Sequence, residues 1–271
     1  MGTGIVQVLV CSDSVNKVFW WGRELSSLTD AFNRLKKNLN KQLKRDKETT
    51  NTLDDLMAKI VICEDFTHLN SCELIIEAIK ENINDKKQLY ENIYDFIGDN
   101  SLIATNTSSL SITDLSMSTP KPENFIGMHF FNPTPIMNLV ELIRGLQTSD
   151  SIIAKAENII SLLGKTPVLV NDSPGFIVNR MLIPMVNEAV TILAENIASK
   201  EYIDQAMKLG ANHPIGPLAL ADLIGVDVCL SIMETLFIET GDPKYRAHPM
   251  LKQYVRAGML GRKTKKGFYS Y

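Results

Sequence analysis

Short apolar segments alternate with helical patterns along residues 1–171, and this alternation is the strongest constraint on the fold. Seven segments have strand character: 17–21, 60–63, 74–77, 102–105, 125–131, 138–143 and 167–170. They show little alternation of apolar and polar residues, which is typical of strands covered on both faces. Helical patterns such as 85–97 and 151–163 lie between several of them. Strands separated by helices predict βαβ units and a largely parallel sheet, so we expect an α/β fold.

The pattern changes after Asn171. Residues 172–175 have the composition of a loop and helix cap, and four helical patterns follow: 176–197, 199–209, 219–238 and 248–257. This second part of the sequence contains no convincing strand pattern. We therefore predict two domains, an α/β domain over 1–171 and an all-helical domain over 172–271.

The composition narrows the possible partners. A formal net charge of -3 over 271 residues argues against nucleic acid as the main partner. No apolar run approaches the roughly 20 residues that a membrane span needs, and the N-terminus lacks the pattern of a secretory signal. The four cysteines and four histidines show no metal-ligand spacing. We expect a cytoplasmic protein with reduced thiols, no metal site and no membrane association.

One helical segment, 25–47, carries two different stripes. The apolar stripe recurs at three- and four-residue spacing and predicts a buried face: Leu25, Leu28, Phe32, Leu35, Leu39 and Leu43. The second stripe is basic: Arg34, Lys37, Lys41, Lys44 and Arg45. A solvated face is the ordinary interpretation of such a stripe. The alternative is a binding surface for a ligand that carries phosphate groups.

His129 and Glu141 are the candidate acid–base pair. The strand segments that contain them are joined by residues 132–135, whose two prolines end a strand. An antiparallel hairpin centred on residue 135 places His129 directly opposite Glu141, with their side chains about 5 Å apart. A single histidine is more often structural than catalytic. In this register, however, Glu141 would orient the imidazole, which suits the base that oxidation of a secondary alcohol requires.

Four motifs surround these residues: NTSSL at 106–110, MHFFNP at 128–133, LVELI at 139–143 and DSPGFIVNR at 172–180. Together they resemble the L-3-hydroxyacyl-CoA dehydrogenases, and the similarity extends from Gly2 to the terminal GFYSY. The resemblance implies a Rossmann-type dinucleotide-binding domain followed by a helical domain for substrate binding and dimerisation, and hence a homodimer. It also implies NAD(P)-dependent interconversion of an (S)-3-hydroxyacyl-CoA and a 3-oxoacyl-CoA. In a bacterial member of butyrate type we expect 3-hydroxybutyryl-CoA and acetoacetyl-CoA.

The resemblance assigns roles to further residues. Ser108 and Asn179 would bind the substrate oxygen beside the His129–Glu141 pair. Contacts to the nicotinamide cofactor are expected from Glu81, Lys86, Ser108, Asn132 and Lys263. The CoA part is expected at the end of the basic helix, at Asn38, Lys44 and Arg45. Asn38 and Arg45 replace a Ser and a Lys of the family pattern, which keeps the positive charge.

The glycine-rich turn departs from the family pattern. A dinucleotide-binding turn uses three glycines after a first strand, and only the third is present here, as Gly2. A helix that begins at Gly2 would still direct its positive end towards the cofactor pyrophosphate. We expect that the first, central strand is missing and that the chain is truncated at its start. The incomplete turn leaves open a second interpretation, a non-catalytic CoA-binding or structural relative.

The end of the second family strand departs as well. NAD-dependent relatives place an Asp where Gly22 stands, and Arg23 follows it. A carboxylate repels the 2′-phosphate of NADP, whereas an Arg can pair with it, so NADP is an alternative to NAD. Sequence drift is the competing explanation. A dehydrogenase of free 3-hydroxy acids is a third functional alternative, which the basic helix disfavours because a free acid offers no phosphate.

Overall fold

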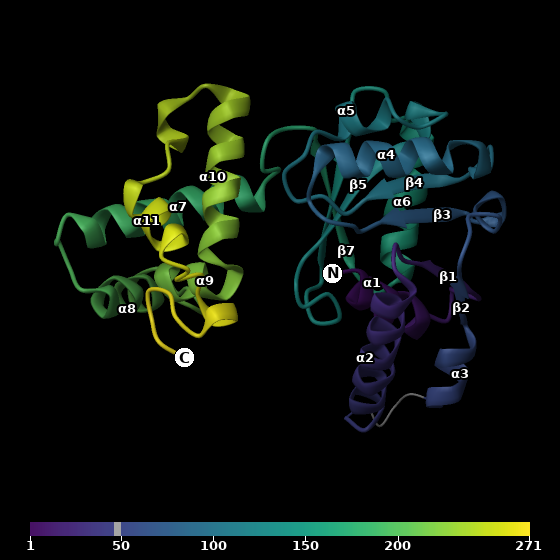
Figure 1. The fold of residues 1–271 in the computed structure, drawn as a ribbon, viewed down its shortest axis with the longest axis horizontal. Helices are drawn as coiled ribbons and strands as arrows, with labels where there is room; N and C mark the ends of the chain where they lie inside the picture. Colours follow the sequence, from purple (N-terminus) through teal and green to yellow (C-terminus); the bar gives the residue numbers. More distant parts are fainter. Residues whose placement is uncertain (46–49) are drawn as a thin grey trace. The chain divides into compact units, whose positions relative to one another are not determined.

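The computed structural model describes residues 1–45 and 50–271, which form two compact units, Met1–Asp172 and Ser173–Tyr271 (Figure 1). The helices and strands of the first unit are α1 (Gly2–Cys11), β1 (Val18–Trp21), α2 (Leu25–Leu43), α3 (Leu53–Ala58), β2 (Ile60–Cys63), β3 (Leu74–Glu77), α4 (Ile83–Ile93), β4 (Leu102–Thr105), α5 (Ile112–Ser116), β5 (Phe125–Phe130), β6 (Leu139–Arg144), α6 (Asp150–Leu162) and β7 (Thr166–Asn171).

The strands of the first unit confirm the predicted α/β fold. Strands β3 to β7 form one sheet in that order, and β1 pairs with β2 in a separate two-stranded sheet. Every strand pair is parallel except β5 with β6, which run antiparallel. Each predicted strand segment agrees with the observed strand to within one residue at either end.

Strand β5 is covered on both faces, and its residues alternate between them. One set packs with Ile5 of α1 and the apolar side of α6: Ile126, Met128 and Phe130. On the other face, Phe125 packs edge-on against Tyr90 of α4, with ring centroids 5.3 Å apart. A Cβ at Gly127 would lie 2.8 Å from Ile112 Cδ1, so α5 approaches this face closely. His129 shares this parity and therefore lies on the side of α4 and α5.

Helix α1 links the two sheets. Its Ile5 packs in the cluster formed by β4, β5, β6 and α6. Val6 and Val10 pack instead in a second cluster, with Val18 of β1 and the apolar stripe of α2. Strands β1 and β3 therefore lie in separate sheets, and α1 packs against both sheets.

The second unit is built from helices. They are α7 (Val178–Ala194), α8 (Lys200–Gly210), α9 (Pro217–Ile224), α10 (Val226–Thr240) and α11 (Pro249–Arg256). The prediction of one continuous helix over 219–238 was wrong, because Gly225 has φ +113° and separates α9 from α10. Buried Asp222 of α9 accepts hydrogen bonds from the N–H groups of Phe268 (2.9 Å) and Tyr269 (2.8 Å), which fastens the C-terminal segment. None of the helices in the described ranges is both long and apolar enough to span a bilayer.

Candidate active site at the β5–β6 hairpin

The hairpin register places His129 and Glu141 together. His129 pairs directly with Glu141 across the antiparallel strands, which confirms the predicted register. The distance between His129 Nδ1 and Glu141 Oε2 is 2.8 Å. Both residues are buried, with 6% and 1% of their surface exposed. A hydrogen bond to a carboxylate in such a dry environment is stronger than the same contact in water.

The carboxylate determines how the imidazole can act. An ionised Glu141 only accepts hydrogen bonds, so Nδ1 of His129 carries the proton of this contact. Nε2 is then the basic nitrogen of the ring. The ring of Phe131 lies beside the imidazole, with centroids 4.4 Å apart and planes tilted by 47°. The arrangement provides a proton acceptor whose charged form the neighbouring carboxylate stabilises.

Ser108 lies in the loop that follows β4, at the carboxyl end of a parallel strand, where open α/β sheets bind ligands. The Asn106 side chain fixes this loop to β5, because its Oδ1 accepts a hydrogen bond from Phe130 N–H at 2.9 Å. Thr107 Oγ1 accepts a hydrogen bond from Leu110 N–H at 3.0 Å within the loop. The loop is thus attached to β5 one residue beyond His129.

The carboxylate of Glu81 binds the same loop through hydrogen bonds. Its Oε1 accepts hydrogen bonds from Thr107 Oγ1 (2.6 Å), Ser108 N–H (2.7 Å) and Ser108 Oγ (3.1 Å). Burial raises the pKa of Glu81. The positive charge of Lys86 and the hydrogen bonds from the loop together outweigh this effect, so the pKa lies below its ordinary value. Glu81 is therefore ionised at neutral pH and acts as an acceptor.

Lys86 was predicted to contact the cofactor, yet its side chain is completely buried. Its Nζ donates to both carboxylate oxygens of Glu77, at 2.7 and 2.8 Å, and lies 3.5 Å from Glu81 Oε2. Lys86 therefore acts on the site indirectly, through its ion pair with the partly exposed Glu81. Glu77 was not predicted as a site residue from the sequence. A carboxylate at the end of an apolar strand segment, followed by a lysine on the next helix, was the available signal.

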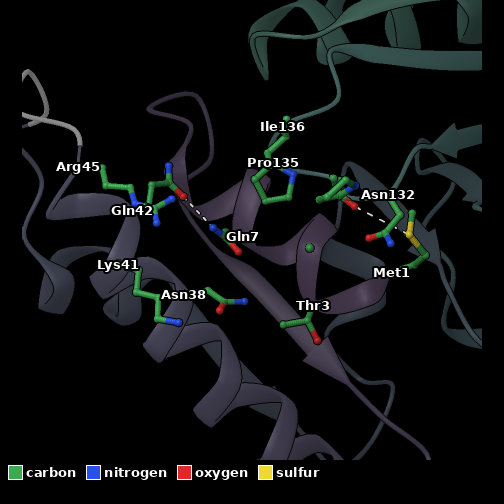
Figure 2. A pocket seen from close by; sticks show the side chains of 13 residues that line it. Met1, Thr3, Gln7, Asn38, Lys41, Gln42, Arg45, Asn132, Pro135 and Ile136 are labelled. Carbon is green, nitrogen blue, oxygen red and sulfur yellow. Dashed lines mark hydrogen bonds between the residues drawn. The ribbon is translucent and has the colours of Figure 1, made fainter. Parts of the chain in front are cut away.

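A pocket of about 670 Å³ opens between α1, the second half of α2 and the loop after β5 (Figure 2). It brings together three predicted ligand contacts, Asn38, Arg45 and Asn132. Lys41 of the basic stripe also lines it, whereas Lys44 is not among the described residues that do. The basic stripe thus contributes two cations, Lys41 and Arg45, to a cavity that the amide of Asn38 also lines.

Two glutamines that the sequence did not single out join the walls of this pocket. Gln7 of α1 donates a hydrogen bond to Gln42 of α2, with Nε2 and Oε1 2.7 Å apart (Figure 2). The loop on the opposite side is held by buried Lys165, whose Nζ donates to the carbonyl oxygens of Thr134 and Met137, both at 2.7 Å. Burial lowers the pKa of Lys165. The pocket walls are therefore fixed by hydrogen bonds on two sides.

The start of α1 suits a dinucleotide. The first turn of this helix carries no acidic side chain. In the described part of the chain, the nearest atom to a Cβ built on Gly2 is Ala78 Cβ, at 3.9 Å, so a ligand can approach the backbone closely. Arg23 pairs with Asp85 in the first turn of α4 at 3.5 Å, and both side chains are exposed. Residues 2 and 23 thus remain available for the predicted cofactor contacts.

Two predicted residues belong to the second unit. Asn179 lies in the first turn of α7. Lys263 lies in the segment after α11 and forms an ion pair with Asp227 of α10, with Nζ 2.6 Å from Oδ2. Gly225, beside this pair, would place a Cβ 3.1 Å from the Lys263 ammonium. Within this unit Lys263 is therefore held against the junction of α9 and α10.

Comparison with known families covers both units. Residues 1–173 match the NAD binding domain of 3-hydroxyacyl-CoA dehydrogenase, and residues 175–271 match the C-terminal domain of the same family. The chain belongs to the 3-hydroxyacyl-CoA dehydrogenase family. This family is NAD-dependent, and its first domain is the cofactor-binding one. The resemblance inferred from the sequence motifs is confirmed.

Individual relatives align along the whole chain. A 3-hydroxybutyryl-CoA dehydrogenase of Clostridioides difficile is 47% identical over 271 residues, which are 100% of this chain and 96% of the relative. The crystal structure of (S)-3-hydroxybutyryl-CoA dehydrogenase from Ralstonia eutropha superimposes with a TM-score of 0.94 at 45% identity, covering 100% of this chain and 95% of the other. The prediction of a truncated start is not borne out by these comparisons. In the structure, α1 is packed against both sheets from Ile5 onwards.

The residues at the end of β1 generate a prediction on cofactor preference. We expect NADPH to be used at least as well as NADH, because Gly22 presents no carboxylate to a 2′-phosphate. Gly22→Asp should shift the preference towards NADH. An Asp fits there, since the nearest atom to a new Cβ is the Leu28 side chain at 3.4 Å. The measurement is kcat/KM for both cofactors, with Gly22→Ala as the uncharged control. A strong native preference for NADH would contradict the expectation.

Proposed function

We propose that this chain catalyses the reversible reduction of acetoacetyl-CoA to (S)-3-hydroxybutyryl-CoA with a nicotinamide cofactor. The observation that carries the proposal is the buried His129–Glu141 pair, 2.8 Å apart, next to the anchored Ser108 loop. The choice of a four-carbon substrate is supported by the names of relatives at 43–47% identity, which are 3-hydroxybutyryl-CoA dehydrogenases. The non-catalytic alternative has no need of a buried, oriented imidazole.

His129 is the proton acceptor in oxidation and the proton donor in reduction. The hydroxyl proton of the substrate passes to Nε2 of His129, and the resulting imidazolium is stabilised by Glu141 through Nδ1–H. A bound nicotinamide ring would supply the acceptor for the hydride on the carbon atom that carries this hydroxyl group. In the reverse direction His129 returns the proton to the oxygen. His129 thus gains one proton in oxidation and gives up one proton in reduction.

Ser108 is proposed to bind the substrate oxygen. Ser108 is held by two contacts to Glu81, through its N–H group and its hydroxyl, which limits the positions that its Oγ can occupy. A polar group fixed in advance contributes more to a transition state than a mobile one, because it needs no reorganisation during the reaction. Asn179, in the first turn of α7, supplies an amide with both a donor and an acceptor.

The pocket between α1 and α2 is proposed to bind the phosphate-bearing part of CoA. Arg45 and Lys41 offer positive charge, and Asn38 offers an amide, all on the same cavity wall. Phosphate oxygens form charge-assisted hydrogen bonds with such groups. A free 3-hydroxy acid carries no phosphate that could use these cations, which disfavours that alternative.

Replacing His129 by Gln should lower kcat by about 10²–10⁴-fold, the usual contribution of a positioned acid–base group. Glu141→Gln should lower kcat in the same direction, because the imidazolium then lacks its counter-charge. Steady-state kinetics with acetoacetyl-CoA and the reduced cofactor measure both effects, and CoA-ester binding should be retained. Near-normal turnover in either variant would exclude the pair from the chemistry.

Two neighbouring cations at the end of α2, its C-cap residue Lys44 and the following Arg45, provide a matched test of the CoA pocket. Arg45→Gln should raise KM for the CoA ester about tenfold with little change in kcat, as expected when uniform binding energy of about 1.4 kcal/mol is lost. Lys44→Gln is the control, because it removes the same charge one residue away from the pocket lining. Equal effects in the two variants would indicate long-range attraction rather than a contact. A fall in kcat alone would place Arg45 elsewhere.

We also propose that the chain forms a homodimer through its second unit and works in the cytoplasm. Large apolar side chains are exposed there, including Met181, Leu209 and Ile238, and such surface favours association. No disulfide links the four cysteines in the described part of the chain, as in proteins of reducing compartments. Light scattering should give a mass of twice 30.3 kDa, and cell fractionation should recover the protein with cytosolic markers. A mass of one chain would refute the dimer.

A further inference from the structure

The Glu77 carboxylate is the most completely bonded acceptor near the candidate site. Besides the two hydrogen bonds from Lys86, its oxygens accept hydrogen bonds from Ile79 N–H (2.6 Å), Thr105 Oγ1 (2.7 Å) and Tyr90 Oη (3.3 Å). Glu77 and Thr105 are the last residues of adjacent strands β3 and β4, and both are buried. A buried ion pair needs such additional hydrogen bonds to offset the cost of removing two charges from water.

The contacts continue from this carboxylate to Ser108. Lys86, fixed by Glu77, presents its ammonium to Oε2 of Glu81 at 3.5 Å. The other oxygen of Glu81, Oε1, accepts the hydrogen bonds of the Ser108 loop. The two oxygens of Glu81 are therefore divided between the buried cation and the loop. A displacement of Lys86 would rotate or shift the carboxylate that holds Ser108.

We propose that Glu77 is a positioning residue that fixes Ser108 through Lys86 and Glu81. The proposal rests on the proposed function, because it requires Ser108 to act on the substrate oxygen. A purely structural role would be the attachment of α4 to β3. The two roles differ in one respect: an attachment changes the stability of the fold, whereas positioning changes the rate constant of the folded enzyme through Ser108 alone.

The experiment compares Glu77→Gln with the wild type well below the melting temperature of both proteins. Loss of the negative charge should lower kcat about tenfold to a hundredfold, since a misplacement of about 1 Å can cost about 10²-fold. KM for acetoacetyl-CoA should remain within about twofold, because the CoA pocket lies elsewhere. Lys87→Gln is the control. Lys87 lies next to Lys86 on α4, and the substitution breaks its ion pair with Asp114 of α5, outside the network, so kcat should be unchanged.

A double-mutant cycle with Ser108→Ala separates the possible outcomes. If Glu77 acts through Ser108, Glu77→Gln in the Ser108→Ala background should lower kcat by less than about twofold further. An undiminished loss in that background, or wild-type kcat in Glu77→Gln, overturns the proposal for Glu77. Wild-type kcat in Ser108→Ala alone refutes instead the proposed function of Ser108.

Thr105→Val keeps the test decisive if Glu77→Gln does not fold. This substitution removes one 2.7 Å hydrogen bond to Glu77 and leaves both buried charges in place. It should lower kcat several-fold, and the loss should again disappear in the Ser108→Ala background. An unchanged kcat in Thr105→Val would overturn the proposal.

Discussion

Strands β5 and β6 run antiparallel within a sheet whose other pairs are parallel, and this reversal creates the site. In an antiparallel pair, two residues stand directly opposite each other, so a histidine and a glutamate twelve positions apart can share one hydrogen bond. A parallel crossover would have needed a helix between them. The reversal depends in turn on the loop of residues 132–138, which buried Lys165 holds through two carbonyl oxygens.

The site contains two carboxylates in different electrostatic surroundings. Glu141 is buried and shares a hydrogen bond with the imidazole of His129, which is neutral or charged at different stages, so its effect on His129 changes during a reaction cycle. Glu81 is partly exposed and lies beside a permanent cation, Lys86, which favours its ionised form. Glu141 is thus suited to stabilise His129 when it gains a proton, and Glu81 to remain a constant hydrogen-bond acceptor.

Much of the first unit could be predicted from the sequence because its signals are local. The strands are short apolar runs, and the hairpin register follows from two prolines midway between His129 and Glu141. The break at Gly225 could not be predicted, since apolar residues continue at helical spacing on both sides of it. The burial of Lys86 could not be predicted either. It depends on a tertiary contact with β3, and a lysine in a first turn is ordinarily exposed.

For the basic stripe, too, the sequence predicts the positive charge but not which side chains line the pocket. Lys41, in the last turn of α2, and Arg45, two residues after the end of this helix, both line the pocket. Lys44, the C-cap residue of α2, belongs to the same cluster of charges, yet it is not among the described residues that line the pocket. Composition and spacing therefore predict a basic surface. Which of its side chains line the pocket depends on tertiary contacts with other elements.

Helix α1 determines how the first unit unfolds. Its Ile5 completes the core beneath β4 to β6, and its Val6 and Val10 complete the core beneath β1 and α2. Neither core can be closed without the helix, so detachment of this one segment exposes apolar surface in both. The two sheets, although not hydrogen-bonded to each other, are therefore expected to open as one cooperative unit. A ligand that binds at the first turn of α1 would lower the frequency of this opening across the whole unit.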